Sequence, residues 1–220
     1  SIKLTLAEKE MSLMQSMINP HFLFNCLGTI SSMAILENAP NTQNISNKIA
    51  RYLRSSMDLV GSYITLAEEI RLIKQYLYIQ SLRFGDRIHC RINCDAECES
   101  AILPAMCLQP IVENAIIHGF KNRIQGGSIE TMIRREEDGR LDICIQDDGV
   151  GMCKEELERL RLEIREPYQS HHHCLGLHSV VSQLQIAFPG QVSFEIESTP
   201  EQGTQIVIRI PFNATLSKSP

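Results

Sequence analysis

The sequence lacks several features that define common classes of protein. None of its apolar runs approaches the roughly 20 residues that cross a bilayer. Its formal net charge is -5 and no block of basic residues stands out, so we do not expect it to bind nucleic acid. It has no internal repeat and no low-complexity tract. Hydrophobic residues make up 43% of its 220 positions, which is enough to form a core and excludes a mainly disordered chain.

The eight cysteines are not expected to form a metal cluster. Cys90, Cys94 and Cys98 recur every four residues, which raises the question of zinc. However, Ile88, Cys90, Ile92 and Cys94 alternate with polar residues, as on one buried face of a β-strand. We therefore interpret these cysteines as packing thiols. Many unpaired cysteines without a recognisable secretory signal also favour a reducing, intracellular setting.

The N-terminal part of the chain has the periodicity of two amphipathic helices. Apolar side chains follow three- and four-residue steps over 14–24, with Pro20 expected to kink the helix. After a break at 37–41, a second pattern covers 45–60 at four-residue spacing. One helical hairpin buries little, so we expect two hairpins to pair into a dimeric four-helix bundle. Because the chain begins inside a helical pattern, we also expect it to be a fragment of a longer protein.

A third helix is predicted to connect this hairpin to a compact domain. Thr65 and Glu68 have the spacing of a capping box, and the helix is expected to end near 83–86. Beyond this point, alternation predicts strands over 88–94, 129–133, 141–145, 192–196 and 206–210, with helices over 104–118, 153–165 and 177–188. Helices grouped against one face of a mixed sheet form an α/β sandwich. The expected fold class of the whole chain is therefore α+β.

A turn with a carboxylate and two glycines follows one predicted strand. The sequence contains no G-x-x-x-x-G-K-[ST], which excludes a P-loop nucleotide site. It does contain Asp147-x-Gly149-x-Gly151. A buried carboxylate at a strand end can accept a hydrogen bond from the amine of a planar base, while glycines allow close approach of the backbone. The alternative is an ordinary Asp-Gly turn.

Three further segments accompany this turn. Upstream, Asn114 and His118 are four residues apart on a predicted helix, and an amide oxygen is a suitable magnesium ligand. Downstream, Gly176 lies at a helix start, where free N–H groups can bind phosphate. Gly203 and Thr204 precede the last strand. Taken singly, each of these residues also has a purely structural interpretation.

Together the four segments resemble the N, G1, G2 and G3 boxes of the GHKL superfamily of ATP-binding proteins, which includes gyrase, heat-shock chaperones, histidine kinases and MutL. The resemblance implies that the chain binds ATP with Mg²⁺. It implies that Asn114 coordinates magnesium, that Asp147 holds the adenine amino group and that His118 contacts a phosphate. The remaining cofactor-binding positions that it implies are Gly149, Gly151, Gly176, Leu177, Gly203 and Thr204.

The N-terminal helix narrows the resemblance further. The segment 18–25, with Pro20-His21-Phe22 at its centre, is similar to the phosphoacceptor motif of LytS-type sensor histidine kinases. The alternative for His21 is a hydrogen-bonded core histidine. The resemblance implies that His21 accepts the γ-phosphoryl group of ATP within a homodimer. It also implies a response-regulator receiver domain as partner and membrane attachment only through a missing N-terminal region, so that the chain is the cytoplasmic portion of a bacterial inner-membrane protein.

With this resemblance, the expected domains can be given boundaries. They are dimerisation and phosphotransfer helices over 1–63, a helical linker over 64–86, an ATP-binding catalytic domain over 87–213 and a tail over 214–220. The segment 152–174 is expected to form a mobile polar lid over ATP. It contains three consecutive histidines, which we interpret as part of the lid because adjacent loop residues rarely converge on one metal ion.

Two departures from the family pattern bear on nucleotide affinity. Cys174 stands where the G2 box has its first glycine, and Asp148 stands where the G1 box more often has Asn. Two rival functions also remain. One is a GHKL ATPase, but Pro110 occupies the position of its general-base glutamate, four residues before Asn114. The other is a non-catalytic module that binds nucleotide and dimerises.

Overall fold

The computed structural model describes residues 20–120, 123, 126–165 and 175–213. Cys174, the three histidines at 171–173 and most of the turn before Gly176 lie outside the described residues, as does the helix segment needed to judge a kink at Pro20. The chain divides into two compact units between Met57 and Asp58. The helix expected as a linker is thus counted with the second unit.

The first unit is a helical hairpin with little core of its own. Helix α2 (Pro20–Leu36) and helix α3 (Pro40–Asp58) are joined by a short turn. Ser46 on α3 donates to the Leu27 carbonyl on α2 at 2.7 Å. The buried side chains are small, whereas several large apolar side chains of α2 are exposed: Phe22, Ile30, Met33, Ile35 and Leu36. The hairpin therefore leaves apolar surface uncovered, as its sequence predicts.

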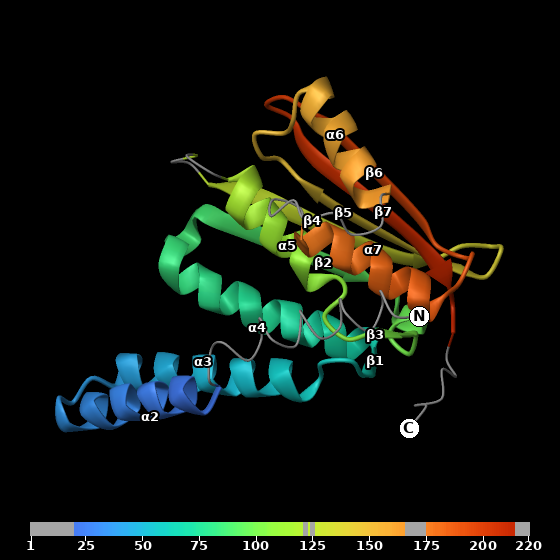
Figure 1. The fold of residues 1–220 in the computed structure, drawn as a ribbon. Helices are drawn as coiled ribbons and strands as arrows, with labels where there is room; N and C mark the ends of the chain where they lie inside the picture. The colour runs from blue at the N-terminus through green and yellow to red at the C-terminus, as the bar shows by residue number, and fades with distance from the viewer. Residues whose placement is uncertain (1–19, 121–122, 124–125, 166–174, 214–220) are drawn as a thin grey trace. The chain divides into compact units, whose positions relative to one another are not determined.

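The second unit is built on a mixed five-stranded sheet (Figure 1). Its strand order is β2-β4-β5-β7-β6, and β2 runs parallel to β4 while all other neighbours are antiparallel. The strands are β2 (Ile88–Cys94), β4 (Gly127–Arg135), β5 (Arg140–Asp147), β6 (Ser193–Thr199) and β7 (Gly203–Pro211). The mixed α/β architecture predicted from the alternating patterns is confirmed.

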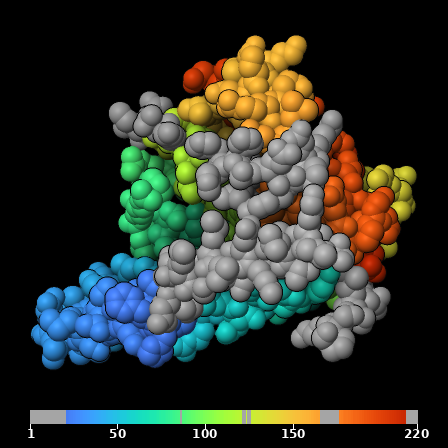
Figure 2. Space-filling model, in the orientation of Figure 1, coloured from blue at the N-terminus to red at the C-terminus, as the bar shows by residue number. Residues whose placement is uncertain are grey.

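Helices cover one face of this sheet and bury its apolar side. Figure 1 shows α4 (Leu66–Phe84), α5 (Gln109–Asn114) and α7 (Leu175–Ala187) on that face. The core includes fully buried side chains from strands and helices, such as Ile133, Ile143, Leu184 and Ile208. Helix α6 (Lys154–Arg165) packs beside β6 and lies at the surface in Figure 2, in gold, with most of its side chains exposed.

A small second sheet joins the start of α4 to the segment before α5. Strand β1 (Tyr63–Thr65) pairs antiparallel with β3 (Ile102–Pro104). Thr65 then caps α4 in the predicted capping box, accepting from Glu68 N–H at 3.3 Å while its own N–H donates to Glu68 at 3.0 Å. The helix predicted over 104–118 is wrong at its start, because β3 extends to Pro104 and α5 begins at Gln109.

The described part of the second unit also contains three short helical turns. Two are 3₁₀ turns, at Gly85–Arg87 and Ala96–Cys98. The third is a π-helical turn at Ala115–Gly119, which continues α5. A π turn widens the helix locally and often occurs at functional sites. It was not predicted, because hydrophobic periodicity does not distinguish it from an α-helix over five residues.

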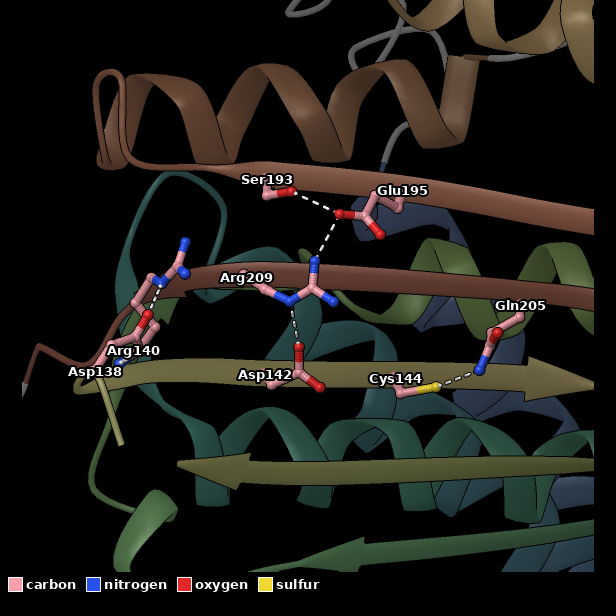
Figure 3. A network of polar contacts seen from close by, with 8 residues as sticks. All are labelled: Asp138, Arg140, Asp142, Cys144, Ser193, Glu195, Gln205 and Arg209. Atoms are coloured by element: carbon pink, nitrogen blue, oxygen red, sulfur yellow. Dashed lines mark hydrogen bonds and ion pairs between the residues drawn. The ribbon is translucent and has the colours of Figure 1, made fainter. Parts of the chain in front are cut away.

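The face of the sheet opposite these helices carries a polar network (Figure 3). Arg209 on β7 pairs with Asp142 on β5 at 2.9 Å and with Glu195 on β6 at 2.6 Å, so it links three neighbouring strands. Partly exposed pairs of this kind contribute at most about 1 kcal/mol each. Their main consequence is a solvated face.

The remaining sequence expectations concern metals and membranes. Cys90 and Cys94 share the inward side of β2 but are only half-buried. Burial raises the pKa of each thiol to about 11, which keeps both protonated at neutral pH. Within the described ranges, no cluster of His, Cys, Asp and Glu could hold a metal ion. No helix in the same ranges is both long enough and apolar enough to cross a membrane.

Candidate functional site

Asp147 is a buried carboxylate at the end of β5. Only 7% of its surface is exposed, and its Oδ1 accepts the N–H of Gly149 at 2.8 Å. Burial raises the pKa of Asp147, although main-chain N–H groups of Gly149 and Thr204 lower it. The negative charge of Asp148 raises it further and Arg123 lowers it. The structure thus holds an acceptor in a poorly solvated position, as the sequence predicts.

The Asp147 turn packs closely on the end of the helical segment that carries Asn114. A Cβ atom on Gly149 would lie 2.5 Å from the Cα of Gly119, and one on Gly119 would lie 2.9 Å from Asp147 Oδ1. Val150 N–H donates to the Gly119 carbonyl at 2.8 Å. Side chains at these two glycines would fill the space beside the carboxylate. Gly119 was not among the predicted site residues, although its place directly after His118 was a usable signal.

The turn before β7 closes the other side of Asp147. Gly203 has φ +91°, and a Cβ atom there would overlap with the main-chain oxygen of Asp147. Gly151 has φ +62°, and a Cβ atom there would overlap with the carbonyl of Thr199. These two positions require glycine both for backbone conformation and for space. Glu201 N–H also donates to the Val150 carbonyl at 2.7 Å, which joins the two turns.

Ser198, which no sequence motif identified, connects these turns through hydrogen bonds. Ser198 Oγ hydrogen-bonds the Gly203 carbonyl and the Thr204 hydroxyl, each at 2.9 Å. It also accepts the N–H of Met152 at 2.9 Å, at the start of the predicted lid. Ser198 thereby joins the turn before β7 to the segment that follows the Asp147 turn. A single serine near the end of a strand gives no recognisable sequence signal for this role.

Asn114 is the last residue of α5, directly before the π turn, and is partly exposed. A Cβ atom on Gly176, at the start of α7, would lie 3.7 Å from Asn114 Nδ2 and 3.6 Å from Pro110 Cβ. The predicted magnesium residue and the predicted phosphate-facing glycine are therefore neighbours. His118 is exposed. The neighbouring Glu113 accepts from Gln109 Nε2 at 2.7 Å.

Leu177 differs from the other predicted cofactor residues. It lies in the first turn of α7 and is only 6% exposed, as part of the hydrophobic core. Its position fixes α7 against the sheet.

Four segments that are far apart in the sequence are thus joined in the second unit, by direct hydrogen bonds or by close approach of glycines.

The hydrogen bonds of Asp148 show how the chain accommodates an acid at the position where the G1 box more often has Asn. Its Oδ1 accepts the N–H of Ser128 at 2.8 Å and its Oδ2 accepts the Ser128 hydroxyl at 2.8 Å. Arg123 lies 3.6 Å from Oδ1 and also donates to the Asp148 carbonyl. The carboxylate of Asp148 thus holds the turn after β5 against β4 through Ser128.

We expect Asp148→Asn to have a small effect. The amide oxygen can still accept from Ser128 N–H, and the Ser128 hydroxyl can rotate to accept from the amide nitrogen. The ion pair with Arg123 is partly exposed, so its loss changes the free energy of unfolding by about 1 kcal/mol or less. Urea unfolding and nucleotide titration of Asp148→Asn measure both quantities. A larger loss in either would show that the charge of Asp148 itself is required.

The phosphoacceptor candidate lies in the first unit. His21 is exposed, one residue into α2 as the structure describes it. Its Nδ1 lies 3.3 Å from the Asn25 side-chain nitrogen, one helical turn later. An amide can donate to Nδ1 or, after rotation about its terminal bond, accept from it, so Asn25 can select the tautomer of the ring.

The chain is similar to several known proteins. Residues 9–88 match the family described as histidine kinase, and residues 101–214 match the family of histidine kinase-, DNA gyrase B- and HSP90-like ATPases. Sensor histidine kinase YesM of Bacillus subtilis is 28% identical over 209 residues, covering 95% of this chain and 34% of YesM. Sensor protein LytS of Staphylococcus saprophyticus is 28% identical over 210 residues, covering 94% of this chain and 34% of LytS.

The chain spans about a third of the length of these relatives. Among solved structures, the catalytic domain of histidine kinase ThkA superposes with a TM-score of 0.50 at 16% identity, covering 70% of this chain and 96% of that domain. This likeness shows a common fold. The ATPase family match alone covers more than half of the chain. The chain therefore belongs to the histidine kinase-, DNA gyrase B- and HSP90-like ATPases, the GHKL superfamily, and its N-terminal match places it with the histidine kinases.

Proposed function

We propose that the chain is the catalytic part of a two-component sensor histidine kinase. It binds ATP with Mg²⁺ in the second unit, phosphorylates His21 in the first and passes the phosphoryl group to an aspartate of a response regulator. One observation supports this proposal above the others. Asp147, Asn114 and the glycines beside them lie in one compact unit, and the same chain carries the His21 motif.

The residues around Asp147 fit an amino-substituted planar base. Asp147 supplies a buried acceptor, and Gly119 and Gly149 leave the space beside it free of side chains. Asn114 would hold Mg²⁺ through its amide oxygen, a hard ligand of the kind this ion prefers. When bound, the ion neutralises charge on the phosphates. Gly176, next to Asn114, lets a phosphate approach the start of α7 without a side chain in between.

His21 supplies the nucleophile. A neutral imidazole has a free lone pair near pH 7 and needs no strong base to remove a proton first. In the structure the Asn25 side-chain nitrogen faces Nδ1. After rotation of the amide, its oxygen would accept from Nδ1–H and leave the lone pair of Nε2 free to attack. An N–P bond forms at Nε2, the bond between the γ-phosphorus and the bridging oxygen breaks, ADP leaves with that electron pair, and the Nδ1 proton passes to solvent. Because His21 and Asp147 belong to different units, His21 must be brought to the nucleotide of its own chain or of the partner chain during the cycle.

The proposal includes a homodimer and a cytoplasmic location. Helix α2 contains no charged residue and exposes large apolar side chains, among them Ile30, Met33 and Leu36. A second hairpin would cover this surface in a four-helix bundle. We infer the response regulator, the cytoplasmic setting and attachment to a bacterial inner membrane from the sensor histidine kinase relatives, which are about three times longer.

The two rival functions make different use of the same nucleotide site. A GHKL ATPase needs a base to activate water, but Pro110 occupies the expected position and Glu113 is engaged by Gln109. A non-catalytic module would bind nucleotide without any transfer. Neither rival accounts for an exposed histidine paired with Asn25 in the Pro20-His21-Phe22 motif.

Autophosphorylation with γ-labelled ATP and magnesium tests the proposal. We expect label that survives alkali and is lost in acid, as a phosphohistidine requires. Asn114→Ala should reduce labelling by about 100-fold, the upper range for disturbing a metal site. Asn93→Ala, an exposed asparagine on β2, is the matched control and should label like the unchanged chain. Hydrolysis without label would favour the ATPase, and binding without either reaction would favour the regulatory module.

A further inference from the structure

Glu69 is a fully buried acid that the proposed mechanism does not use. It lies on the inward side of α4, between Leu66 and Ile73, with none of its surface exposed. Its Oε2 accepts the N–H of Met106 at 2.7 Å. Its Oε1 accepts the N–H groups of Leu108 at 2.9 Å and Gln109 at 3.4 Å. All three donors are main-chain groups of one turn, 37 to 40 residues later in the sequence.

That turn is the start of α5, which lacks a cap of its own. Leu108 occupies the N-cap position and makes no side-chain hydrogen bond there. Pro110 has no N–H to satisfy, and Ile111 N–H donates to the Leu108 carbonyl at 3.1 Å. The free N–H groups of a helix start need an acceptor when they are buried. Glu69 supplies this acceptor from another helix.

The turn also has a conformation that requires support. Met106 has φ +60°, which is uncommon for a residue with a side chain. Its side chain packs against the cluster of Ile64, Leu72 and Ala105, and Ala105 N–H donates to the Ser62 carbonyl at 2.9 Å. The turn is thus attached to β1 and α4 by packing and by hydrogen bonds, with Glu69 providing three of the bonds.

The distance from this turn to the predicted magnesium residue is short. Helix α5 has six residues, beginning at Gln109 and ending at Asn114. Over so few residues a helix behaves as a rigid rod, with about 1.5 Å of rise per residue. A displacement of its first turn is therefore passed to Asn114 with little loss.

We propose that Glu69 is a positioning residue for magnesium binding, acting through the first turn of α5 to set the location of Asn114. This inference rests on the proposed function, because it assumes that Asn114 holds the ion. Burial raises the pKa of Glu69 and the three main-chain hydrogen bonds lower it. A buried acid whose hydrogen bonds all go to one turn is suited to holding that turn in place.

Three substitutions separate this role from a general effect on folding. In Glu69→Gln, one oxygen becomes an amide nitrogen, a donor that faces Met106 N–H or the N–H groups of Leu108 and Gln109. Glu69→Asp keeps an acceptor-only carboxylate but withdraws it by one methylene. Glu68→Gln is the matched control, because Glu68 is exposed and Gln also serves in a capping box.

The measurement is a Mg²⁺ titration of each full chain with a fluorescent ATP analogue, accompanied by binding in EDTA and by thermal unfolding. We expect the half-saturating Mg²⁺ concentration of Glu69→Gln to rise about 10-fold or more, as for groups that support a metal ligand. Glu69→Asp should show a smaller rise and Glu68→Gln none. Magnesium-free binding, which depends on Asp147, should stay within about twofold in folded variants.

Each outcome of this experiment either supports or overturns the proposed role of Glu69. A folded Glu69→Gln with the Mg²⁺ dependence of Glu68→Gln would overturn the proposal, as would equal losses of magnesium-free and magnesium-dependent binding. If Glu69→Gln does not fold, the same comparison is made with Glu69→Asp. Failure of the proposed function appears separately, as a wild-type chain that binds no nucleotide, and this would overturn both inferences.

Discussion

Substituting His21 by Gln is expected to abolish phosphorylation of the chain while leaving nucleotide binding unchanged. Glutamine has similar length and can still hydrogen-bond Asn25 one turn later, but its amide nitrogen is not a nucleophile. Labelling should fall by roughly three orders of magnitude or more, as for a removed nucleophile. Nucleotide affinity should stay within about twofold, because Asp147 and Asn114 belong to the other compact unit.

The control for this experiment is His89→Gln. His89 is an exposed histidine on β2 with no role in the proposed mechanism, so its variant should label like the unchanged chain. Acid-labile label remaining in His21→Gln would place the acceptor on another histidine and contradict the proposed role. Loss of label in both variants would indicate that the chain tolerates neither change, and unfolding curves would then show it.

Most of the second unit could be predicted from the sequence because its strands have one buried side. Ile88–Cys94 was predicted with the bounds of β2, and the alternating isoleucines of β5 and β7 located the central strands. Strands β1 and β3 were missed, since three residues cannot show an alternation. Their pairing depends on contacts between segments that are almost 40 residues apart, which local pattern does not contain.

The candidate site was predictable to the extent that its residues occur in motifs. Asp147 and Gly149 were predicted because a carboxylate-glycine turn at a strand end is recognisable, and Gly203 because of its place before the last strand. The structure places the three residues together. Ser198 and Gly119 act through single contacts that no motif encodes.

Glu69 did have a sequence signal that was overlooked. It stands three residues after Leu66 and four before Ile73, which places an acid on the apolar side of α4. A charge in such a stripe predicts a buried partner. What the sequence could not supply was the identity of that partner, because main-chain N–H groups have no residue type.

One added methyl group at Gly203, beside the proposed nucleotide site, is also expected to have a large structural effect. Its φ of +91° disfavours any side chain, and a Cβ atom would overlap with the main-chain oxygen of Asp147 on the neighbouring strand. Relief requires β5 and β7 to separate where they are paired at Asp147 and Thr204. We expect Gly203→Ala to lower the free energy of unfolding by about 3 kcal/mol or more and to abolish detectable nucleotide binding.

Gly139→Ala provides the comparison that isolates this contact. Gly139 lies in the turn between β4 and β5 of the same sheet with φ +81°, but nothing lies within 4 Å of a Cβ atom there. Gly139→Ala should lower the free energy of unfolding only by the cost of a side chain in the left-handed backbone conformation, about 1–2 kcal/mol. It should leave nucleotide affinity unchanged. Urea unfolding and nucleotide titration of the two variants measure the difference. Equal stability and equal affinity would mean that the turn at Gly203 can move away from Asp147 freely, and that the close packing of the two turns does not shape the adenine site.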